Sequence, residues 1–539
     1  MKRKQEPATT HEAQHRGGGR RRGDTAAADA PAPDDVCAAD SDDDVPDMSA
    51  LVLEDARRSA PQPLPEVVAT ALAGGDAAAV LAHLLHPLPL QRFEAEVYEQ
   101  HSAVVLRRGS ACRGLLDGLL SKARIDALLR SQRLCYGLHV DVTRYDARAG
   151  RSTLNDGERV AVADDVWRHY AAGASVRILH PQRWVDSIHD TLAALERHFN
   201  CACGCNAYLT PPGTQGFAPH YDDIDAFVLQ LEGRKRWRLY APRLAEEQLP
   251  RTSSPNFAPG DIGEPILDVT LAPGDVLYMP RGCIHQAEAL PDHHSLHITL
   301  STGHANAWVD LFELALPAAL ADAAEQLPAL RRNIPRELLA CVGVMHAPEV
   351  DEDAQPQRDA ARAALDAQRE AFILHAQALL RQVLEHAPLD AAADQLAARF
   401  MRTRLPPRRA QRADGPLQLP APKLSAKSSV RLAFRGAARL VVEAGEACVY
   451  HPFANDRAAS MEGYAPAHTH SAACGDGGCC APDDPARLVF ALEAAPALEV
   501  LLRAHPVPVQ LRALPLERVS DGIAIANRLL RAGVLVADE

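Results

Sequence analysis

APHYDDIDAFVLQLEGRKRWRLY, residues 218–240, carries two functional signals within one short stretch. Residues i and i+2 of a β-strand point to the same face, so the sequence predicts that His220 and Asp222 present an imidazole and a carboxylate side by side. Asp223 and Asp225 would point to the opposite face. Asp222 is therefore the candidate ligand among the three acidic residues.

Further along the chain, VLYMPRGCIHQAEA places His285 near another predicted strand. A sheet that closes on itself would bring this imidazole opposite His220 and Asp222. Two histidines and one carboxylate, with coordination positions left open, form the ligand set of non-haem Fe(II) oxygenases. We predict that His220, Asp222 and His285 bind the metal and form the catalytic centre.

The second signal is a lysine on the inner face of a predicted strand. Alternation along residues 234–240 places Lys235 with Trp237 and Leu239, whereas three arginines occupy the other face. An inward ammonium group is costly unless an anion pairs with it, and no carboxylate alternates with Lys235 on that face. The distal carboxylate of 2-oxoglutarate is the predicted partner. The alternative is a lysine with a buried stem and a solvated head.

A third strand has one polar face. In residues 295–301, SLHITLS, the leucines and isoleucine alternate with His297, Thr299 and Ser301. A polar face on a core strand indicates a lined pocket. His297 and Thr299 are candidates to hydrogen-bond the cosubstrate or to orient a metal ligand.

The run NAYLTPPGTQGFAPHYDDIDAFVLQLEGRKRWRLY, with LAPGDVLYMPRG before His285, resembles the ribosomal oxygenase family. These are the nucleolar JmjC proteins described as histidyl-hydroxylases and lysine-specific demethylases. The resemblance implies a double-stranded β-helix of the cupin/JmjC type with a helical buttress. It also implies one Fe(2+) per subunit, with 2-oxoglutarate and O2 as cosubstrates.

The resemblance also implies roles for individual residues. Lys235 matches the position that binds 2-oxoglutarate, and Asn206 and Tyr208 match positions beside the cosubstrate. Positions that line the substrate mouth are matched by Arg177, Asn256 and Ser301.

Three functions follow as hypotheses. The leading one is hydroxylation of a histidyl residue of a ribosomal protein. The first alternative is demethylation of methylated histone H3 lysines by the same site, because a hydroxylated N-methyl group collapses to formaldehyde whereas a hydroxylated carbon is stable. The second alternative is a catalytically silent JmjC scaffold, which the presence of the triad and of Lys235 disfavours.

Composition bounds the remaining possibilities. A chain of 539 residues is too long for one core, and its net charge of -13 argues against a uniformly basic nucleic-acid binder. We expect no membrane span and no secretory signal. The 12 cysteines are expected to be thiols or metal ligands and to form no disulfides. CACGC (Cys201, Cys203 and Cys205) is expected to be buried small residues, and the His/Cys-rich stretch 468–480 to hold an adventitious metal or none.

The expected fold class is α+β with several domains. Residues 1–62 form a disordered basic and acidic tail, 63–304 the JmjC catalytic domain, 305–403 an all-helical dimerisation domain, 404–427 a linker and 428–539 a winged-helix domain. The dimerisation role is implied by the resemblance, which predicts a homodimer. Basic clusters in the tail and the resemblance favour the nucleus, in particular the nucleolus. The winged-helix domain lacks a basic recognition helix, so we predict protein contact and no sequence-specific DNA binding.

Overall fold

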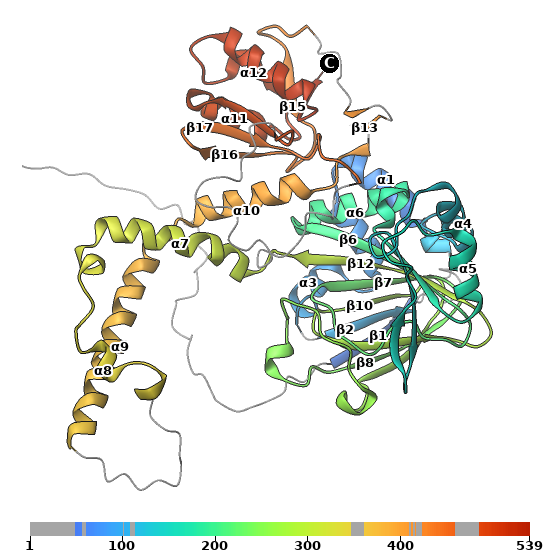
Figure 1. Ribbon diagram of the computed structural model, residues 1–539. Helices are drawn as coiled ribbons and strands as arrows, with labels where there is room; N and C mark the ends of the chain where they lie inside the picture. The colour runs from blue at the N-terminus through green and yellow to red at the C-terminus, as the bar shows by residue number, and fades with distance from the viewer. Residues whose placement is uncertain are drawn as a thin grey trace, which may run out of the picture. The chain divides into compact units, whose positions relative to one another are not determined.

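The computed structural model describes residues 49–55, 61–100, 102–107, 114–346, 360–408, 411–412, 415–416, 423–458 and 484–538. Two sheets form the core of the first part of the described chain (Figure 1). The larger contains, in spatial order, β1 (Ser49–Glu54), β2 (Ser102–Arg107), β10 (Val276–Met279), β7 (Asp225–Glu232), β12 (Ser295–His304), β6 (Ala202–Thr210), β5 (Ser175–Leu179), β3 (Val140–Asp146) and β4 (Gly150–Thr153). The smaller contains β11 (Ile284–Ala289), β8 (Lys235–Tyr240) and β9 (Leu267–Leu271).

Three strands of the large sheet, β2, β7 and β10, contribute to two cores. On β7, Phe227 and Leu229 belong to the apolar cluster on the outer face, whereas Ala226 and Val228 belong to a cluster shared with β8 and β9. Such alternation is expected of a strand buried on both sides. The space between the two sheets is therefore the interior of a cupin-type β-structure, and the predicted α+β core is confirmed.

Helices cover the outer face of the large sheet. They are α1 (Leu64–Gly74), α2 (Ala78–Leu85), α3 (Leu90–Glu96), α4 (Lys122–Ser131), α5 (Ala163–Ala171) and α6 (Asp186–Phe199). Fully buried residues of this layer include Leu84, Phe93, Ile125 and Leu192. The helices thus form the predicted buttress and leave the inner face of the sheet to the site.

One strand lies within the predicted tail, so the expectation of disorder over residues 1–62 is wrong for that part. β1 pairs in parallel with β2 along its whole length. Its sequence, SALVLE, is short but apolar enough to extend the sheet edge, and the flanking acidic run obscured it. Residues 1–48 lie outside the described part of the chain.

The predicted helical region contains α7 (Trp308–Gln326), α8 (Leu338–Cys341), α9 (Ala360–Leu384) and α10 (Leu389–Thr403). The expectation of helices over 305–403 is therefore confirmed for the described residues. In the described residues no helix is long and apolar enough to cross a membrane.

The C-terminal part has its own core. Its two three-stranded sheets are formed by β15 (Ser429–Leu432), β19 (Val509–Gln510) and β20 (Leu535–Asp538), and by β16 (Arg439–Glu443), β17 (Glu446–Tyr450) and β18 (Arg487–Ala491). Helices α11 (Ala495–Arg503) and α12 (Val519–Arg531) pack with them around Leu498 and Leu529. The winged-helix assignment stays a prediction, and stretch 468–480 lies outside the described residues.

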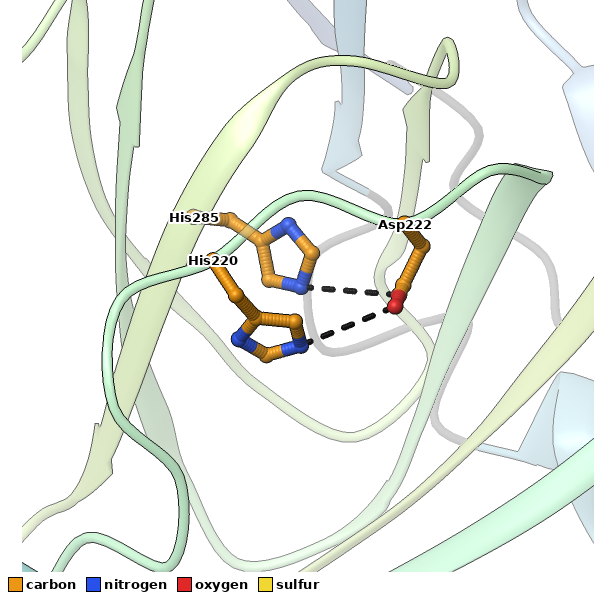
Figure 2. Close-up of side chains that lie close together, drawn as sticks. All are labelled: His220, Asp222 and His285. Carbon is orange, nitrogen blue, oxygen red and sulfur yellow. Dashed lines mark ion pairs between the residues drawn. The ribbon is translucent and has the colours of Figure 1, made fainter. Parts of the chain in front are cut away.

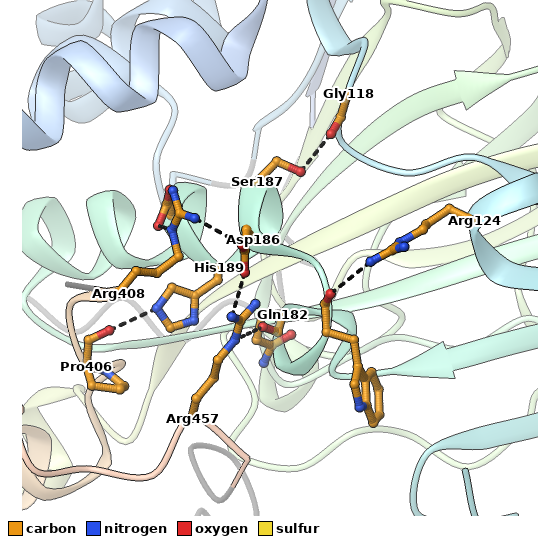
Figure 3. A network of polar contacts seen from close by, with 11 residues as sticks. Gly118, Arg124, Gln182, Asp186, Ser187, His189, Pro406, Arg408 and Arg457 are labelled. Carbon is orange, nitrogen blue, oxygen red and sulfur yellow. Dashed lines mark hydrogen bonds and ion pairs between the residues drawn. The ribbon is translucent and has the colours of Figure 1, made fainter. Parts of the chain in front are cut away.

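The first residues of the predicted linker are not a linker. Arg404 and Leu405 are buried, and the Leu405 N–H donates to the Glu196 carboxylate at 2.9 Å. Figure 3 shows the continuation, in which the His189 ring bonds to the Pro406 carbonyl and Arg408 pairs with Asp186. We name residues 404–408 the docking segment. Composition missed it because Arg404 is buried and donates to the Gly436 carbonyl, and because the exposed Arg408 pairs with Asp186 and Asp190 on α6. The short strands β13 (Gln411–Arg412) and β14 (Gly415–Pro416) follow it.

Candidate metal and cosubstrate site

The structure brings the three predicted metal ligands together. The potential ligand atoms of His220, Asp222 and His285 all lie within 4.8 Å of one another. As Figure 2 shows, both imidazoles direct Nε2 at the same carboxylate, at 3.7 Å from His220 and 3.8 Å from His285. The predicted triad is therefore assembled in one place.

Backbone carbonyls fix the orientation of both rings. His220 Nδ1 lies 2.8 Å from the Ala218 carbonyl oxygen, and His285 Nδ1 lies 3.0 Å from that of Cys283. A carbonyl only accepts, so each Nδ1 carries the proton and each Nε2 presents a lone pair towards Asp222. Burial, with the nearby His220, lowers the pKa of His285 to about 4, so this ring is neutral at pH 7. Two imidazoles oriented in this way, together with a carboxylate, suit a divalent transition metal.

The local structure around His220 differs from the prediction. His220 and Asp222 lie in the connection between β6 and β7 and not on a regular strand. A single antiparallel β-bridge joins His220 to His285, and His285 lies on β11 of the small sheet. Proline and two acidic residues beside the ligand interrupt a strand here, yet the bridge still aligns the two histidines. His220 and Asp222 lie side by side as predicted, but the regular strand that was expected to place them there is absent from this described segment.

Lys235 occupies the interior between the sheets. Its residue is only 5% exposed, and its Nζ donates to the Thr210 hydroxyl at 3.2 Å. No ion pair involves Lys235 in the described part of the chain. Burial accordingly lowers the pKa of Lys235 to about 7. The alternative of a solvated lysine head is thus wrong, and the site offers an ammonium group that lacks an anion.

Unpaired polar atoms gather around this lysine. Four buried side-chain atoms of the inner face have no hydrogen-bond partner among the described residues: Thr143 Oγ1, Asn206 Oδ1, Trp237 Nε1 and His297 Nδ1. Trp237 links them to the triad, since its ring lies 5.3 Å from that of His297 and 6.0 Å from that of His285. Buried polar groups are nearly always paired, so such a cluster fits a polar ligand.

The predicted cosubstrate residues line the same interior. The rings of Tyr208 and His297 stack at 4.8 Å, on adjacent strands, and Asn206 lies opposite Thr299 in the β6–β12 pairing. Burial raises the pKa of Tyr208 and lowers that of His297, so both are neutral. The structure thus brings Asn206, Tyr208, His297 and Thr299 to the face shared with Lys235.

The predicted mouth residues have different surroundings. Arg177 donates to Asp141 through Nε at 3.0 Å and lies over the Phe217 ring, which also neighbours His220. Ser301 contacts His304 at 3.0 Å. Asn256 is exposed, although the adjacent Phe257 bonds to the Pro219 carbonyl beside the triad. Its role stays a prediction.

Several site residues were not anticipated as such. Thr210 shares the β6 face of Asn206 and Tyr208, and Trp237 shares that of Lys235, so alternation was a sufficient signal for both. Asp141 and His304 could not be identified in this way, because their contacts with Arg177 and Ser301 depend on the tertiary structure. The three cysteines of CACGC are buried free thiols, as predicted: Cys201, Cys203 and Cys205.

Comparison with known proteins gives a consistent picture. A JmjC domain model matches residues 177–310, which include the whole triad and Lys235. The chain is 37% identical over 469 residues to the bifunctional lysine-specific demethylase and histidyl-hydroxylase NO66 of Aedes aegypti, covering 84% of this chain and 67% of the relative. It is 38% identical over 475 residues to ribosomal oxygenase 1 of Rattus norvegicus, covering 85% and 72%.

The chain spans 65% of the length of ribosomal oxygenase 1 of Bos taurus, at 37% identity. Among solved structures, the Escherichia coli ribosomal oxygenase YcfD in complex with cobalt and 2-oxoglutarate matches with a TM-score of 0.36 and 16% identity, covering 84% of this chain and 99% of that one.

Proposed function

Since the chain belongs to the JmjC family of ribosomal oxygenases, we propose that it is an Fe(II)- and 2-oxoglutarate-dependent dioxygenase that hydroxylates a histidyl residue of a ribosomal protein. The observation that supports this proposal is that a metal-binding triad and a buried lysine lie together in the space between the two sheets. A triad with converging ligand atoms shares the interior with a buried ammonium group, to which the described residues supply no anion.

The residues present fit both groups. His220, Asp222 and His285 would hold Fe(II) through two Nε2 atoms and one carboxylate. Lys235, with the Thr210 hydroxyl, would bind the distal carboxylate of 2-oxoglutarate, and the orphaned atoms of Asn206, Trp237 and His297 offer it further polar partners. When bound, iron would activate O2 as the oxidant: 2-oxoglutarate would supply two electrons and take one oxygen atom as it becomes succinate and CO2, and the other oxygen atom would hydroxylate a substrate C–H bond.

The protein's own contribution is orientation and exclusion of water. The carbonyls of Ala218 and Cys283 hold both imidazoles in the tautomer that binds a metal. The stacked Tyr208 and His297 rings and the buried Trp237 wall the interior with neutral groups. Lys235 is therefore a buried cation that this interior offers to a charged cosubstrate.

The test is an anaerobic titration of the purified protein with Fe(II) and 2-oxoglutarate, followed by the visible charge-transfer band of the chelate. We expect the band in the wild type and not in Asp222→Ala, because the metal would lose its only carboxylate. Aerobic incubation with ribosomal proteins should then give hydroxylated histidine, detected by mass spectrometry, together with succinate. Absence of the band from the wild type would contradict the proposal.

Demethylation of methylated histone H3 lysines is the second candidate. It is favoured by the name of the Aedes aegypti relative, which includes both activities. The same assays distinguish it, because demethylation releases formaldehyde from a methyl-lysine peptide. The silent-scaffold alternative would require a missing ligand, and none of the three is missing.

We also propose that the protein is a homodimer of the nucleus, with the helical region as its interface. Exposed apolar side chains recur every fourth residue on α7, at Trp308, Phe312, Leu316 and Leu320. Residues four apart share one face of a helix, so these four form a continuous apolar stripe. Such a stripe supports an interface between copies.

A further inference from the structure

Two segments carry the metal ligands, and backbone hydrogen bonds hold these segments together. His220 and Asp222 lie in the connection before β7, whereas His285 is the second residue of β11. The His285 N–H donates to the His220 carbonyl at 2.8 Å, and the His220 N–H donates to the His285 carbonyl at 3.2 Å. Asp222 joins the same partner segment through its carbonyl, which accepts from the Gly282 N–H at 3.1 Å. The position of the carboxylate ligand therefore depends on the turn that contains Gly282.

An ion pair between Asp225 and Arg281 lies at the base of that turn. Arg281 directly precedes Gly282, and Asp225 is the first residue of β7, three positions after Asp222. Arg281 donates twice to the Asp225 carboxylate, from its backbone N–H to Oδ1 at 3.3 Å and from Nη1 to Oδ2 at 2.7 Å. One carboxylate thus binds both the backbone and the side chain of Arg281. It joins the segment that enters β7 to the turn before β11.

This ion pair lies on the face of the sheet that is turned away from the metal site. Asp225 alternates in step with Phe227 and Leu229, which belong to the outer core, whereas Ala226 belongs to the inner one. The Tyr278 hydroxyl, also part of the outer side, donates to Asp225 Oδ1 at 3.3 Å. The pair therefore does not touch the metal site directly, and any effect on the metal must act through the backbone.

The pair is buried, which restricts its geometry. Asp225 is fully buried, the Arg281 side chain is 11% exposed, and Arg281 Nη1 also donates to the Glu99 carboxylate. Burial raises the pKa of Asp225 to about 6, and the neighbouring Arg281 opposes this rise, so the carboxylate is largely ionised at pH 7. A buried ion pair is a weak source of stability, since apolar groups of the same volume often pack as well. Its directional bonds instead fix the distance between the two segments.

The backbone is packed closely around the pair at two glycines. Gly282 has a φ of +88°, and a Cβ there would lie 2.3 Å from the Glu247 carbonyl oxygen. Gly303 lies in a bulge of β12, where the pairing with β6 shifts, and a Cβ there would lie 2.8 Å from Asp225 Oδ2. The turn and the bulge thus enclose the pair from both sides.

The chain neighbours of Asp222 bond to a different segment. The Tyr221 N–H donates to Ser254 Oγ at 2.9 Å, and Ser253 Oγ donates to the Asp223 carboxylate at 2.6 Å. These bonds attach the ligand segment to the connection between β8 and β9 and not to the turn before β11. The ion pair provides the attachment to that turn.

We propose that Asp225 and Arg281 are positioning residues that hold the Asp222 carboxylate at binding distance from the Nε2 atoms of both histidines, and that the metal affinity of the site depends on their ion pair. This inference rests on the proposed function, because it concerns the same metal site. The two histidines are joined to each other by backbone bonds that do not involve the pair. Loss of the pair should therefore release Asp222 and leave both imidazoles in place.

The test is a titration of the purified full-length protein with Co(II), a divalent metal that is more stable in air than Fe(II), followed by visible absorption and by calorimetry. The variants are Asp225→Asn and Arg281→Gln, which each remove one charge, and Arg281→Lys, which keeps it. Asp484→Asn is the matched control, because it removes a part-buried ion pair with Arg402 at 2.8 Å in the C-terminal part of the chain. This control should bind Co(II) as the wild type does.

We expect Asp225→Asn and Arg281→Gln each to weaken Co(II) binding roughly tenfold to a hundredfold, the usual effect of losing an outer partner of a metal ligand. Arg281→Lys should weaken binding less, because an ammonium group keeps the charge but lacks the planar geometry of the guanidinium. Urea denaturation of the metal-free protein shows whether each variant is folded. Arg281→Lys decides the question if the other two are not.

A second background separates positioning from a general loss of structure. In Asp222→Ala the metal is held by the two histidines, so removal of the ion pair should have no further effect on Co(II) affinity. A loss of the same factor in both backgrounds, or an unchanged affinity in every single variant of the pair, would overturn the inference. A wild type that does not bind Co(II), or an Asp222→Ala variant that binds it as tightly as the wild type, overturns the proposed function instead.

Discussion

Lys235 Nζ lies 3.2 Å from Thr210 Oγ1, a neutral hydroxyl, in an interior where the described residues provide it with no carboxylate. Burial alone lowers the pKa of Lys235 to about 7. A bound carboxylate would raise it again, because an opposite charge favours the protonated form.

The affinity for 2-oxoglutarate should therefore depend on pH. Above about pH 7 the free protein must take up a proton to bind the anion, so affinity should fall as pH rises, up to tenfold per pH unit. Isothermal titration calorimetry in buffers of different ionisation enthalpy measures this uptake. Lys235→Arg is the matched control, since arginine stays charged and should bind without the pH dependence. An equally steep dependence in that variant would exclude Lys235 as its source.

Substitution of Gly303 should destabilise the protein more than substitution of an ordinary turn glycine. A Cβ at Gly303 would lie 2.8 Å from Asp225 Oδ2, which pairs with Arg281 at 2.7 Å. At Gly137 the φ is similar, +77°, but a Cβ would meet nothing within 4 Å. We expect Gly303→Ala to lower the free energy of unfolding by roughly 2 to 4 kcal/mol and Gly137→Ala by about 1 kcal/mol, as judged by urea denaturation. Equal effects would mean that the bulge tolerates a side chain.

Acid should weaken the contact between α6 and the docking segment. Burial lowers the pKa of His189 from 6.5 to about 4, so the folded protein keeps this ring neutral while the unfolded chain is protonated below 6.5. The contribution of the neutral His189 ring to the stability of the folded protein is complete above pH 6.5. It is lost as the pH falls towards 4, by up to roughly 3 kcal/mol. His189→Gln removes the titration and retains an amide donor for the Pro406 carbonyl. The unfolding free energy of this variant, relative to that of the wild type, should rise as the pH falls from 7 to 5. No relative change would mean that His189 is not the source of the acid sensitivity.

A charge within the α7 stripe should disrupt the proposed dimer. Phe312 is 42% exposed and lies between Trp308 and Leu316 on the stripe. Phe312→Glu should give a monomer in light scattering at concentrations where the wild type is dimeric, because an unpaired carboxylate cannot be buried cheaply. The same change at the exposed Leu244, outside the helical region, is the control. A wild type that is monomeric at all concentrations would reject the interface.

Alternation along single strands was enough to predict much of the site. Lys235 and Trp237 on β8 and Asn206 and Tyr208 on β6 point inward as their spacing requires. The triad was predicted from residue types, although His220 is held by one bridge to His285 and not by a strand. Local sequence can reveal which residues share a face, but only when the strand is regular.

What the sequence did not reveal depends on contacts between distant segments. His304 reaches Ser301 only through a bulge, which reverses the alternation on which the prediction relies. The docking segment reads as a linker until Glu196 and His189, more than two hundred residues earlier, provide its partners. The apolar β1 was concealed by the charged run before it, because composition averages over a window longer than a short strand.

The docking segment also determines where the chain could be truncated without exposing a buried group of the β-core. The Glu196 carboxylate accepts from the N–H groups of Cys203, on β6, and of Leu405. One carboxylate thus ties the strand that presents Asn206 and Tyr208 to a segment beyond the last helix of the helical region. A catalytic unit cut off at residue 304 would expose that buried group. Any division of the chain into modules would therefore keep residues 404–408 with the β-core, because the helical region begins directly after β12 and ends at a segment that contacts α6.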